Sequence, residues 1–320
     1  MKKILKPFLI GLSAILFILV VFAIYVYSSE IPYYDVSTIE YEAKSSPKSI
    51  ERGKKLTTML CANCHLNRET GKLTGIKMTD APPEFGEIYS QNITQDKTYG
   101  IGNWSDGELL YLLRTGVKKN GQYSPPYMAK LPTMADEDLD AIISFLRSDN
   151  EMVKADATKD TPTKPSFLTK LLSRIAWKPL PLPKAKIYVP DSSNTKELGR
   201  YLANNLECFS CHSADFKTNN FLIPESSEGY FGGGNKPLDM QGRIMLTANL
   251  TPDKETGIGN WTKEKFVKAV KYGIKENEPA LSYPMMPYSR LNDYEVEAIF
   301  EYLKTIPPIK NKIERSIYDN

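Results

Sequence analysis

Two copies of one five-residue motif constrain this chain more than any other feature. Cys61-Ala-Asn-Cys-His65 and Cys208-Phe-Ser-Cys-His212 both follow the pattern Cys-x-x-Cys-His. The chain has four Cys and two His, and the two motifs contain every one of them. No cysteine is left for a disulfide or a nucleophile, and no histidine is left for a general base. Chance can produce one such motif, but two copies that use every Cys and His indicate a dedicated chemistry.

This pattern is the attachment signature of c-type haem. Two thiols three positions apart can each form a thioether with one vinyl group of the same porphyrin, and the adjoining His then lies against the iron. A zinc cluster is the remote alternative, but a zinc protein would not need the export that the N-terminus indicates. We therefore expect two covalently bound haem c groups. Their expected attachment and proximal-ligand residues are Cys61, Cys64 and His65 for the first haem, and Cys208, Cys211 and His212 for the second.

Length and charge narrow the class of protein. A chain of 320 residues suggests two domains. Its 41% apolar and 25% charged residues are typical of globular proteins. The formal net charge of +3 is close to balance and no basic stripe is visible, so we expect no nucleic-acid partner.

The N-terminus reads as a membrane anchor. Lys2, Lys3 and Lys6 precede an apolar run from Phe8 to Tyr27, which is long enough for a helix to cross the hydrocarbon core. A cleaved signal peptide is the alternative, but the apolar core is long and the cleavage site is poor. We expect an uncleaved transmembrane anchor over residues 1–30. By the positive-inside rule, the rest of the chain lies in the periplasm or extracytoplasmic space, on the outer face of the cytoplasmic membrane.

The remainder of the chain is an internal repeat. The segment Asn92–Trp104 matches Asn249–Trp261, so each residue has a counterpart 157 positions later. The haem motifs are only 147 positions apart, which leaves ten extra residues in the second repeat. We place these extra residues around the Gly-rich loop 230–235.

Each repeat has the periodicity of short helices, and no convincing strand alternation is visible, so the predicted fold class is all-α. Ser105, with Glu108 at the capping-box position, opens one helix, and Thr262 opens its counterpart. The other expected helices are 50–59, 136–148, 195–205 and 293–305.

These patterns predict an N-terminal transmembrane helix followed by two tandem cytochrome c-like domains. The stretch between the repeats lacks periodicity and contains Trp177-Lys-Pro-Leu-Pro-Leu-Pro183, so we expect a proline-containing linker that packs along both domains. The expected boundaries are 1–30 for the anchor, 45–149 for the first domain, 150–192 for the linker, 193–309 for the second domain and 310–320 for a tail.

A haem iron with one His ligand needs a second ligand or keeps an open site. No free His remains, so a Met thioether is the natural candidate. In the first repeat Met128 is the candidate and Met134 its alternative. In the second repeat the ungapped alignment pairs Met128 with Met285, and Met286 is the alternative because a Pro follows it. The competing interpretation of these Met residues is flexible core packing.

Two repeated tryptophans are weaker candidates for the haem environment. Trp104 and Trp261, with Asn103 and Asn260, could pack on the haem edge or bond a propionate. A structural role is equally compatible with the sequence, since a buried Trp usually needs a partner for its N–H.

Taken together, the motifs resemble dihaem cytochromes c. The residues that carry the resemblance are the two Cys-x-x-Cys-His motifs, the two segments that end in Gly-Ile-Gly-Asn-Trp, and the ending Tyr302-Leu-Lys-Thr-Ile-Pro-Pro308. The chain is most similar to bacterial membrane-anchored cytochromes with two class I domains, and similar modules form cytochrome subunits of membrane-bound alcohol and aldehyde dehydrogenases. The resemblance spans residues 49–308. It implies a cytochrome c fold in each half, with His65 and His212 as proximal ligands and Met128 and Met285 as distal ligands.

The expected function is one-electron transfer rather than enzymatic catalysis. The expected partners are a quinol-oxidising complex, a dehydrogenase or a terminal oxidase at the membrane face. One alternative is membership of a larger oxidoreductase as its cytochrome subunit. The other is a dihaem enzyme with one open haem, such as a peroxidase, which is disfavoured because both halves offer a Met and no spare His exists.

Overall fold

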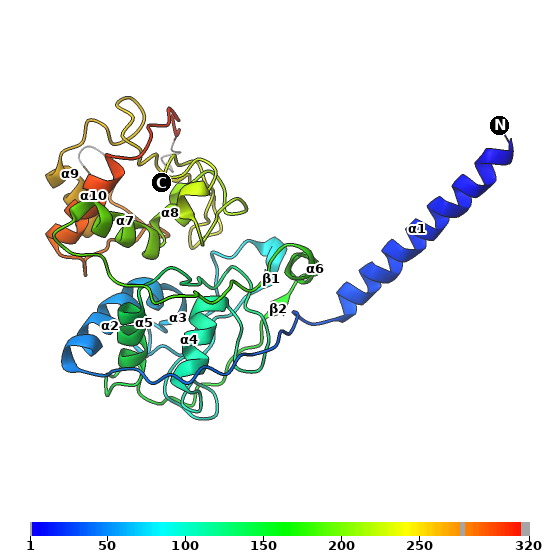
Figure 1. Cartoon of the computed structure of the whole chain (residues 1–320), viewed down its shortest axis with the longest axis horizontal. Coiled ribbons are helices and arrows are strands. Elements are labelled where there is room, and N and C mark those ends of the chain that lie inside the picture. The colour runs from blue at the N-terminus through cyan, green and yellow to red at the C-terminus, as the bar shows by residue number, and fades with distance from the viewer. Residues whose placement is uncertain (1, 276–278, 315–320) are drawn as a thin grey trace.

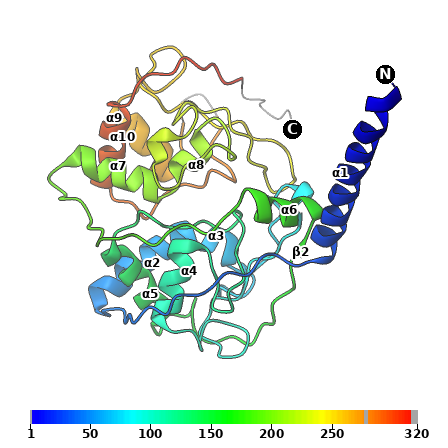
Figure 2. The same ribbon diagram turned by 45° about the vertical axis from the view of Figure 1, so that its right-hand side comes forward.

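The structure is a computed structural model that describes residues 2–275 and 279–314. Helix α1 (Lys2–Ser28) projects away from two helical halves that lie side by side (Figures 1 and 2). Of the expected tail 310–320, residues 315–320 lie outside the described residues.

The first half contains α2 (Pro47–Leu60), α3 (Ala62–His65), a 3-10 turn (Pro83–Phe85), α4 (Asp106–Thr115) and α5 (Asp136–Leu146). Helix α6 (Phe167–Ile175) follows, and the second half contains α7 (Thr195–Asn205), α8 (Cys208–His212), a 3-10 turn (Pro224–Ser226), α9 (Lys263–Tyr272) and α10 (Asp293–Leu303).

Strand structure is limited, in the described ranges, to one short pair. β1 (Gly86–Glu87) runs antiparallel to β2 (Lys164–Pro165), with Gly86 opposite Pro165. The predicted all-α class is therefore confirmed.

The predicted helix starts match the observed caps. The Ser105 hydroxyl accepts a hydrogen bond from the Glu108 N–H at 3.1 Å, and the Glu108 carboxylate accepts one from the Ser105 N–H at 2.7 Å. The Thr262 hydroxyl caps α9 by accepting from the Lys265 N–H at 3.2 Å. The predicted helices 136–148 and 293–305 both end two residues early, since the Ser148 and Thr305 N–H groups bond the carbonyls three residues before them and tighten the last turn.

Each half is built on a crossing of two helices. Helix α2 packs against α5, and α7 packs against α10 (Figure 1). A Cβ atom on Gly53 would lie 1.8 Å from the Ala141 carbonyl oxygen, and one on Gly199 would lie 1.9 Å from the Ala298 carbonyl oxygen. Only a residue without a Cβ permits backbones this close.

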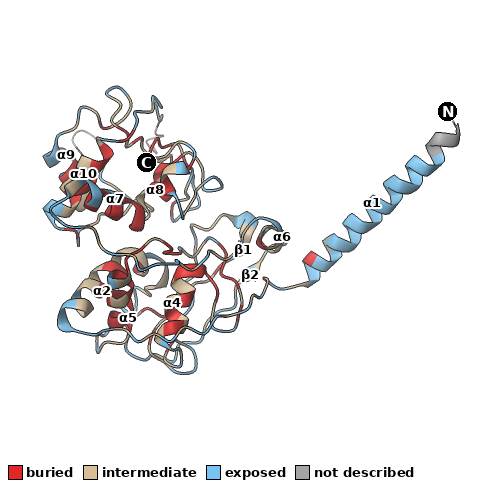
Figure 3. Cartoon of the chain, in the orientation of Figure 1, coloured by how far each residue is buried: buried red, intermediate tan, exposed pale blue. Residues whose placement is uncertain are grey.

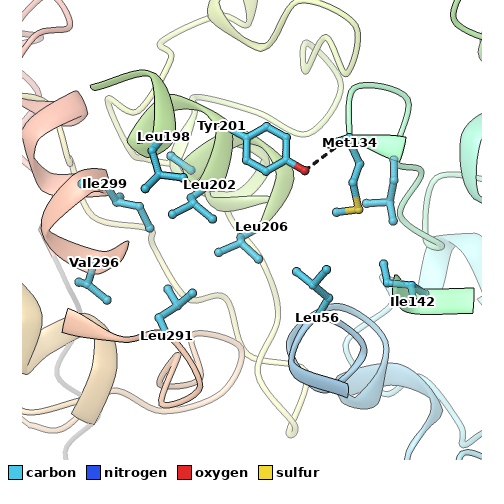
Figure 4. Close-up of a cluster of buried hydrophobic side chains, with 14 of the residues drawn as sticks. Leu56, Met134, Ile142, Leu198, Tyr201, Leu202, Leu206, Leu291, Val296 and Ile299 are labelled. Carbon is cyan, nitrogen blue, oxygen red and sulfur yellow. Dashed lines mark hydrogen bonds between the residues drawn. The ribbon is translucent and has the colours of Figure 1, made fainter. Parts of the chain in front are cut away.

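The apolar faces predicted for the last helix of each half are buried. Figure 3 shows buried residues concentrated on the helices of both halves, and the apolar core is one continuous cluster that includes side chains of both (Figure 4). These predicted core residues are Leu139, Ile142, Ile143 and Leu146 in α5, and Val296, Ile299, Phe300 and Leu303 in α10.

A buried polar network also joins the halves. The Tyr201 hydroxyl on α7 donates to the Asp138 carboxylate at 2.6 Å. It also accepts from the Ala135 N–H at 3.0 Å, the dashed line at Tyr201 in Figure 4. Arg52 of α2 forms an ion pair with the same carboxylate, which is only 1% exposed. Lys55 on α2 and Glu295 on α10 form a second ion pair between the halves.

The linker differs in one respect from the expectation. It contacts both halves as predicted, through backbone bonds from Leu180 to Thr115 and from Asp136 to Ile187, and through a bond from the Tyr294 hydroxyl to Ser192. The prediction that the linker lacks helical periodicity was wrong for the segment that forms α6. Apolar residues do recur at helical spacing there, at Phe167, Leu168, Leu171, Leu172 and Ile175, but the fold buries Thr169 and Ser173 on the other side of the helix.

The N-terminal helix has the properties of a membrane span. Within α1, residues 6–28 are long and apolar enough to cross a bilayer. Figure 3 shows this helix exposed along nearly its whole length, with Val26 near its end buried.

Candidate functional site

Each Cys-x-x-Cys-His motif forms a single helical turn. In the first, the Cys61 carbonyl accepts from the N–H of Cys64 at 3.1 Å and from that of His65 at 2.9 Å. Helix α8 holds the second motif in the same way. Since residues three and four positions apart share a helix face, both thiols and the imidazole of each motif belong to one surface.

The two imidazoles have equivalent hydrogen-bond partners. His65 Nδ1 lies 2.7 Å from the Gln91 carbonyl oxygen, and His212 Nδ1 lies 2.8 Å from the Ala248 carbonyl oxygen. A carbonyl can only accept, so Nδ1 carries the proton in both rings. The Nε2 atom is then the unprotonated nitrogen, which is the form that binds a metal.

The repeated Asn-x-Thr segments hold these carbonyls in place. Gln91 directly precedes Asn92, and Ala248 directly precedes Asn249. The Asn92 side-chain oxygen accepts from the Thr94 N–H at 2.9 Å and from its hydroxyl at 2.7 Å, and Asn249 makes the same two bonds to Thr251 at the same distances. Sequence reasoning found the repeated segment but missed this role, for which the only signal was its position after the motif.

A glycine N–H fixes each motif from the other side. Gly75 donates to the His65 carbonyl at 2.9 Å, and Gly233 donates to the His212 carbonyl at 2.8 Å. Gly75 is ten residues after its His, whereas Gly233 is 21 residues after His212. The extra residues of the second repeat therefore lie between His212 and Gly233. The predicted loop 230–235 therefore overlaps only the end of this interval.

The surroundings of the donor groups suit covalent haem. The four cysteines form no disulfide. Burial raises the pKa of Cys61 and Cys208 to about 12 and that of Cys64 and Cys211 to about 11. Burial also lowers the pKa of His65, which favours the neutral ring that an iron ligand requires. Two thiols and one oriented imidazole on one turn are the donor set that haem c needs.

The methionine loops of the two halves are anchored alike. In the first half, Ser124 N–H donates to the Gly116 carbonyl and Leu131 N–H to the Leu113 carbonyl, both at 2.7 Å. Met128 lies between these two anchors, half-buried, and its sulfur accepts from the Ser124 hydroxyl at 3.5 Å. In the second half the same two bonds join Leu281 to Gly273 and Tyr288 to Val270, both at 2.8 Å.

Equal loop lengths decide which methionines are equivalent. Every anchor in the second half lies 157 positions after its counterpart, so Met285 occupies the position of Met128 and Met286 that of Ala129. Met134 corresponds to Leu291, and both are buried at 1–2% exposure. Both side chains belong to the apolar core cluster.

The tryptophans lie beside the core in both halves. Trp104 and Trp261 are half-buried and pack against the apolar cluster. The amides of Asn103 and Asn260 donate to the carbonyls of Lys97 and Lys254, at 2.7 and 2.8 Å, and thus close the preceding turn. Contact between either tryptophan and a haem edge stays a prediction.

Several known proteins with similar sequences are cytochromes or cytochrome subunits. The chain is 29% identical over 277 residues to the fructose dehydrogenase cytochrome subunit of Gluconobacter japonicus, which covers 83% of this chain and 54% of that protein. It is 28% identical over 258 residues to the gluconate 2-dehydrogenase cytochrome c subunit of Pantoea cypripedii, covering 77% of this chain and 56% of that one. The chain thus spans about half the length of these curated relatives. A diheme cytochrome c-type protein of Cereibacter sphaeroides is 25% identical over 261 residues, covering 78% of this chain and 83% of that protein.

The family model for cytochrome c matches the chain twice, at residues 50–149 and 197–307. Each match contains one Cys-x-x-Cys-His turn, its oriented imidazole and one methionine loop. The chain therefore belongs to the cytochrome c family and carries two covalently bound haem c groups.

Proposed function

We propose that this protein is a membrane-anchored dihaem cytochrome that carries single electrons and has no catalytic site of its own. The observation that carries the proposal is the equivalence of the two sites: in each half a backbone carbonyl orients the His, and a loop of the same length presents a Met. The bound haem iron supplies one-electron chemistry. The protein supplies orientation and an apolar surrounding.

We assign His65 and Met128 as axial ligands of the first iron, and His212 and Met285 as those of the second. The Nδ1 bonds of both His residues to carbonyls increase the basicity of Nε2 and keep the rings from turning. The loop anchors on both sides of each Met limit movement of the sulfur, and a thioether ligand favours the reduced state. Two retained ligands at each site would leave no open position for a substrate, which argues against the peroxidase-like alternative.

A dehydrogenase is the partner that the relatives favour as electron donor. The fructose and gluconate 2-dehydrogenase proteins named above are the cytochrome subunits of dehydrogenases. We propose that this chain likewise accepts electrons from a dehydrogenase, as a separate carrier or as a subunit, and passes them to a quinol-oxidising complex or a terminal oxidase. Helix α1 would hold it on the outer face of the cytoplasmic membrane, with domains at 45–149 and 193–309, a linker at 150–192 and a tail at 310–320.

An optical spectrum of the ferric holoprotein tests the proposal. We expect two haems per chain by the alkaline pyridine assay, with the weak red Met-to-iron charge-transfer band arising from both. Met128→Ala and Met285→Ala should each remove about half of that band. Met134→Ala and Met286→Ala are the matched controls and should leave it unchanged.

Other outcomes would point elsewhere. Loss of the band in Met286→Ala instead of Met285→Ala would move the second ligand by one residue. A high-spin haem that binds carbon monoxide or cyanide rapidly at neutral pH would support the open-site enzyme. A full band in both Met128→Ala and Met285→Ala would contradict the assignment of ligands.

A further inference from the structure

Helix α6 in the linker has an inverted pattern of burial. Thr169 and Ser173 are fully buried, whereas Phe167, Leu168 and Ile175 are 42%, 39% and 60% exposed. A helix at a protein surface normally buries its apolar side chains and exposes its polar ones. The apolar face of α6 therefore needs a second explanation.

The inversion is a stable part of the fold. The Thr169 hydroxyl donates to the Phe85 carbonyl at 2.8 Å, and the Ser173 hydroxyl donates to the Thr169 carbonyl at 2.8 Å. The buried polar groups are thus satisfied. Ser166 caps the helix by accepting from the Thr169 N–H at 3.2 Å, and the β1–β2 pair holds the chain just before it. The first half thereby fixes which face of α6 points outward.

The outward face lies next to the end of α1. The Lys170 ammonium donates to the Tyr27 carbonyl at 2.8 Å, and the Arg174 guanidinium donates to the Glu30 carbonyl at 2.5 Å. Arg174 also lies 5.4 Å from the centre of the Tyr25 ring. Figures 1 and 2 both show α6 where α1 meets the rest of the molecule.

We infer that α6 is an interfacial helix, whose apolar face enters the boundary between headgroups and acyl chains of the bilayer that α1 crosses. The inference rests on the proposed anchor. The surface is continuous with the span: Tyr25 and Tyr27 would lie at the membrane–water interface, where tyrosine is enriched, and α6 is bonded to that turn. Exposed apolar side chains with Lys170, Arg174 and Lys178 on the same helix or just after it form the pattern of helices that lie in the interface, where basic groups meet lipid headgroups.

This contact would orient the haem domains. A single transmembrane helix leaves the attached domains free to tilt. A second contact beside it, made by a helix rigidly joined to the first half, restricts that tilt and presents a constant face to redox partners.

Thiol accessibility in liposomes tests the inference with the full-length holoprotein. Because haem attachment uses all four native cysteines, a single introduced cysteine is the only free thiol. We compare Ile175→Cys and Leu168→Cys on α6 with Tyr272→Cys at a residue 53% exposed. Tyr272 belongs to α9, a helix far from α1 in Figures 1 and 2. The extent of labelling by a charged maleimide and by an uncharged maleimide is measured by intact-protein mass spectrometry. The ratio of the charged to the uncharged extent reports the exposure of the thiol to water.

In liposomes of phosphatidylglycerol and phosphatidylethanolamine, this ratio should be at least about tenfold lower at both α6 positions than at Tyr272→Cys. Equal ratios at all three positions would overturn the inference. That result is also the one expected if a partner protein, and not lipid, covers α6 in the cell. Flotation of the liposomes reports the anchor separately. Protein that fails to float with the lipid contradicts the anchor, whereas protein that floats with accessible α6 thiols contradicts only the interfacial helix.

Discussion

At the scale of single residues, Glu207 is the most unusual ionisable group near the haem motifs. It directly precedes Cys208 and has a left-handed backbone conformation with φ 63°. Burial raises the pKa of its carboxyl to about 8, partly opposed by the hydroxyl of Ser210 and the charge of Lys130 in the first half. The folded state therefore prefers the protonated acid.

This preference predicts a pH dependence of stability. Because a glutamate carboxyl ordinarily has a pKa of 4.5 and that of Glu207 in the fold is about 8, the folded state binds more protons than the unfolded state between these values. The free energy of unfolding should fall as the pH rises through this window, and Glu207→Gln should lose that part of the dependence. Guanidinium unfolding of both proteins at about pH 5 and about pH 8, the two ends of this window, measures the effect. A parallel pH profile in the two proteins would contradict the raised pKa of the Glu207 carboxyl.

At the scale of elements, the helix crossings depend on two glycines. Gly53 and Gly199 hold equivalent places in α2 and α7, each against a carbonyl of the partner helix. The sequence did not predict a packing role for either glycine, since an isolated Gly in a helical pattern indicates only a lower helix propensity.

Gly53→Ala and Gly199→Ala should each destabilise the protein by at least about 1–3 kcal/mol, because the added methyl group must push two packed helices apart. Thermal unfolding followed by circular dichroism measures the loss. Glu51→Ala, at an exposed position of α2, is the matched control and should change little. A gain in stability, as helix propensity alone would predict for Gly→Ala, would show that the helices can separate without cost.

The caps offer a second prediction at this scale. Ser105→Ala removes the hydroxyl that accepts from the Glu108 N–H, keeps the backbone N–H that donates to the Glu108 carboxylate, and should cost about 1 kcal/mol of stability. Ser105→Asp, which can still accept from the Glu108 N–H, should retain most of it. Chemical unfolding distinguishes the two variants, and an Asp variant as weak as the Ala variant would contradict a capping role.

At the scale of the whole molecule, the two halves behave as one unit because their cores and polar groups are shared. The Tyr201 hydroxyl bonds both the Ala135 N–H and the Asp138 carboxylate of the other half. Tyr201→Phe leaves the buried Ala135 N–H without this acceptor and should lower stability by about 1–3 kcal/mol. It should also separate the unfolding transitions of the halves, read from the Soret band against far-ultraviolet circular dichroism. Tyr188→Phe, at a residue 64% exposed, is the control. An unchanged midpoint in Tyr201→Phe would mean that the bonds of the Tyr201 hydroxyl contribute nothing to the association of the halves.

Much of this protein followed from local patterns. The residues that predict haem attachment lie within one helical turn. The helix starts at Ser105 and Thr262 are predicted by the cap residue and the residue three positions later. The internal repeat alone revealed the equivalence of Met128 and Met285, because the two copies keep the same spacing on both sides of the methionine. Such features involve neighbours in the chain or a constant offset along it, so a linear reading finds them.

The roles of backbone atoms and of segments far apart in the chain became visible only in the folded protein. The carbonyls of Gln91 and Ala248 orient the imidazoles, but a carbonyl is common to every residue and leaves no mark in the sequence. The Tyr201–Asp138 bond joins residues 63 positions apart. The outward apolar face of α6 depends on which side the first half covers. The cofactor and the helices that hold it were predictable from local sequence patterns, whereas the partners of the imidazoles, the contacts between the halves and the exposed helix face depend on long-range packing.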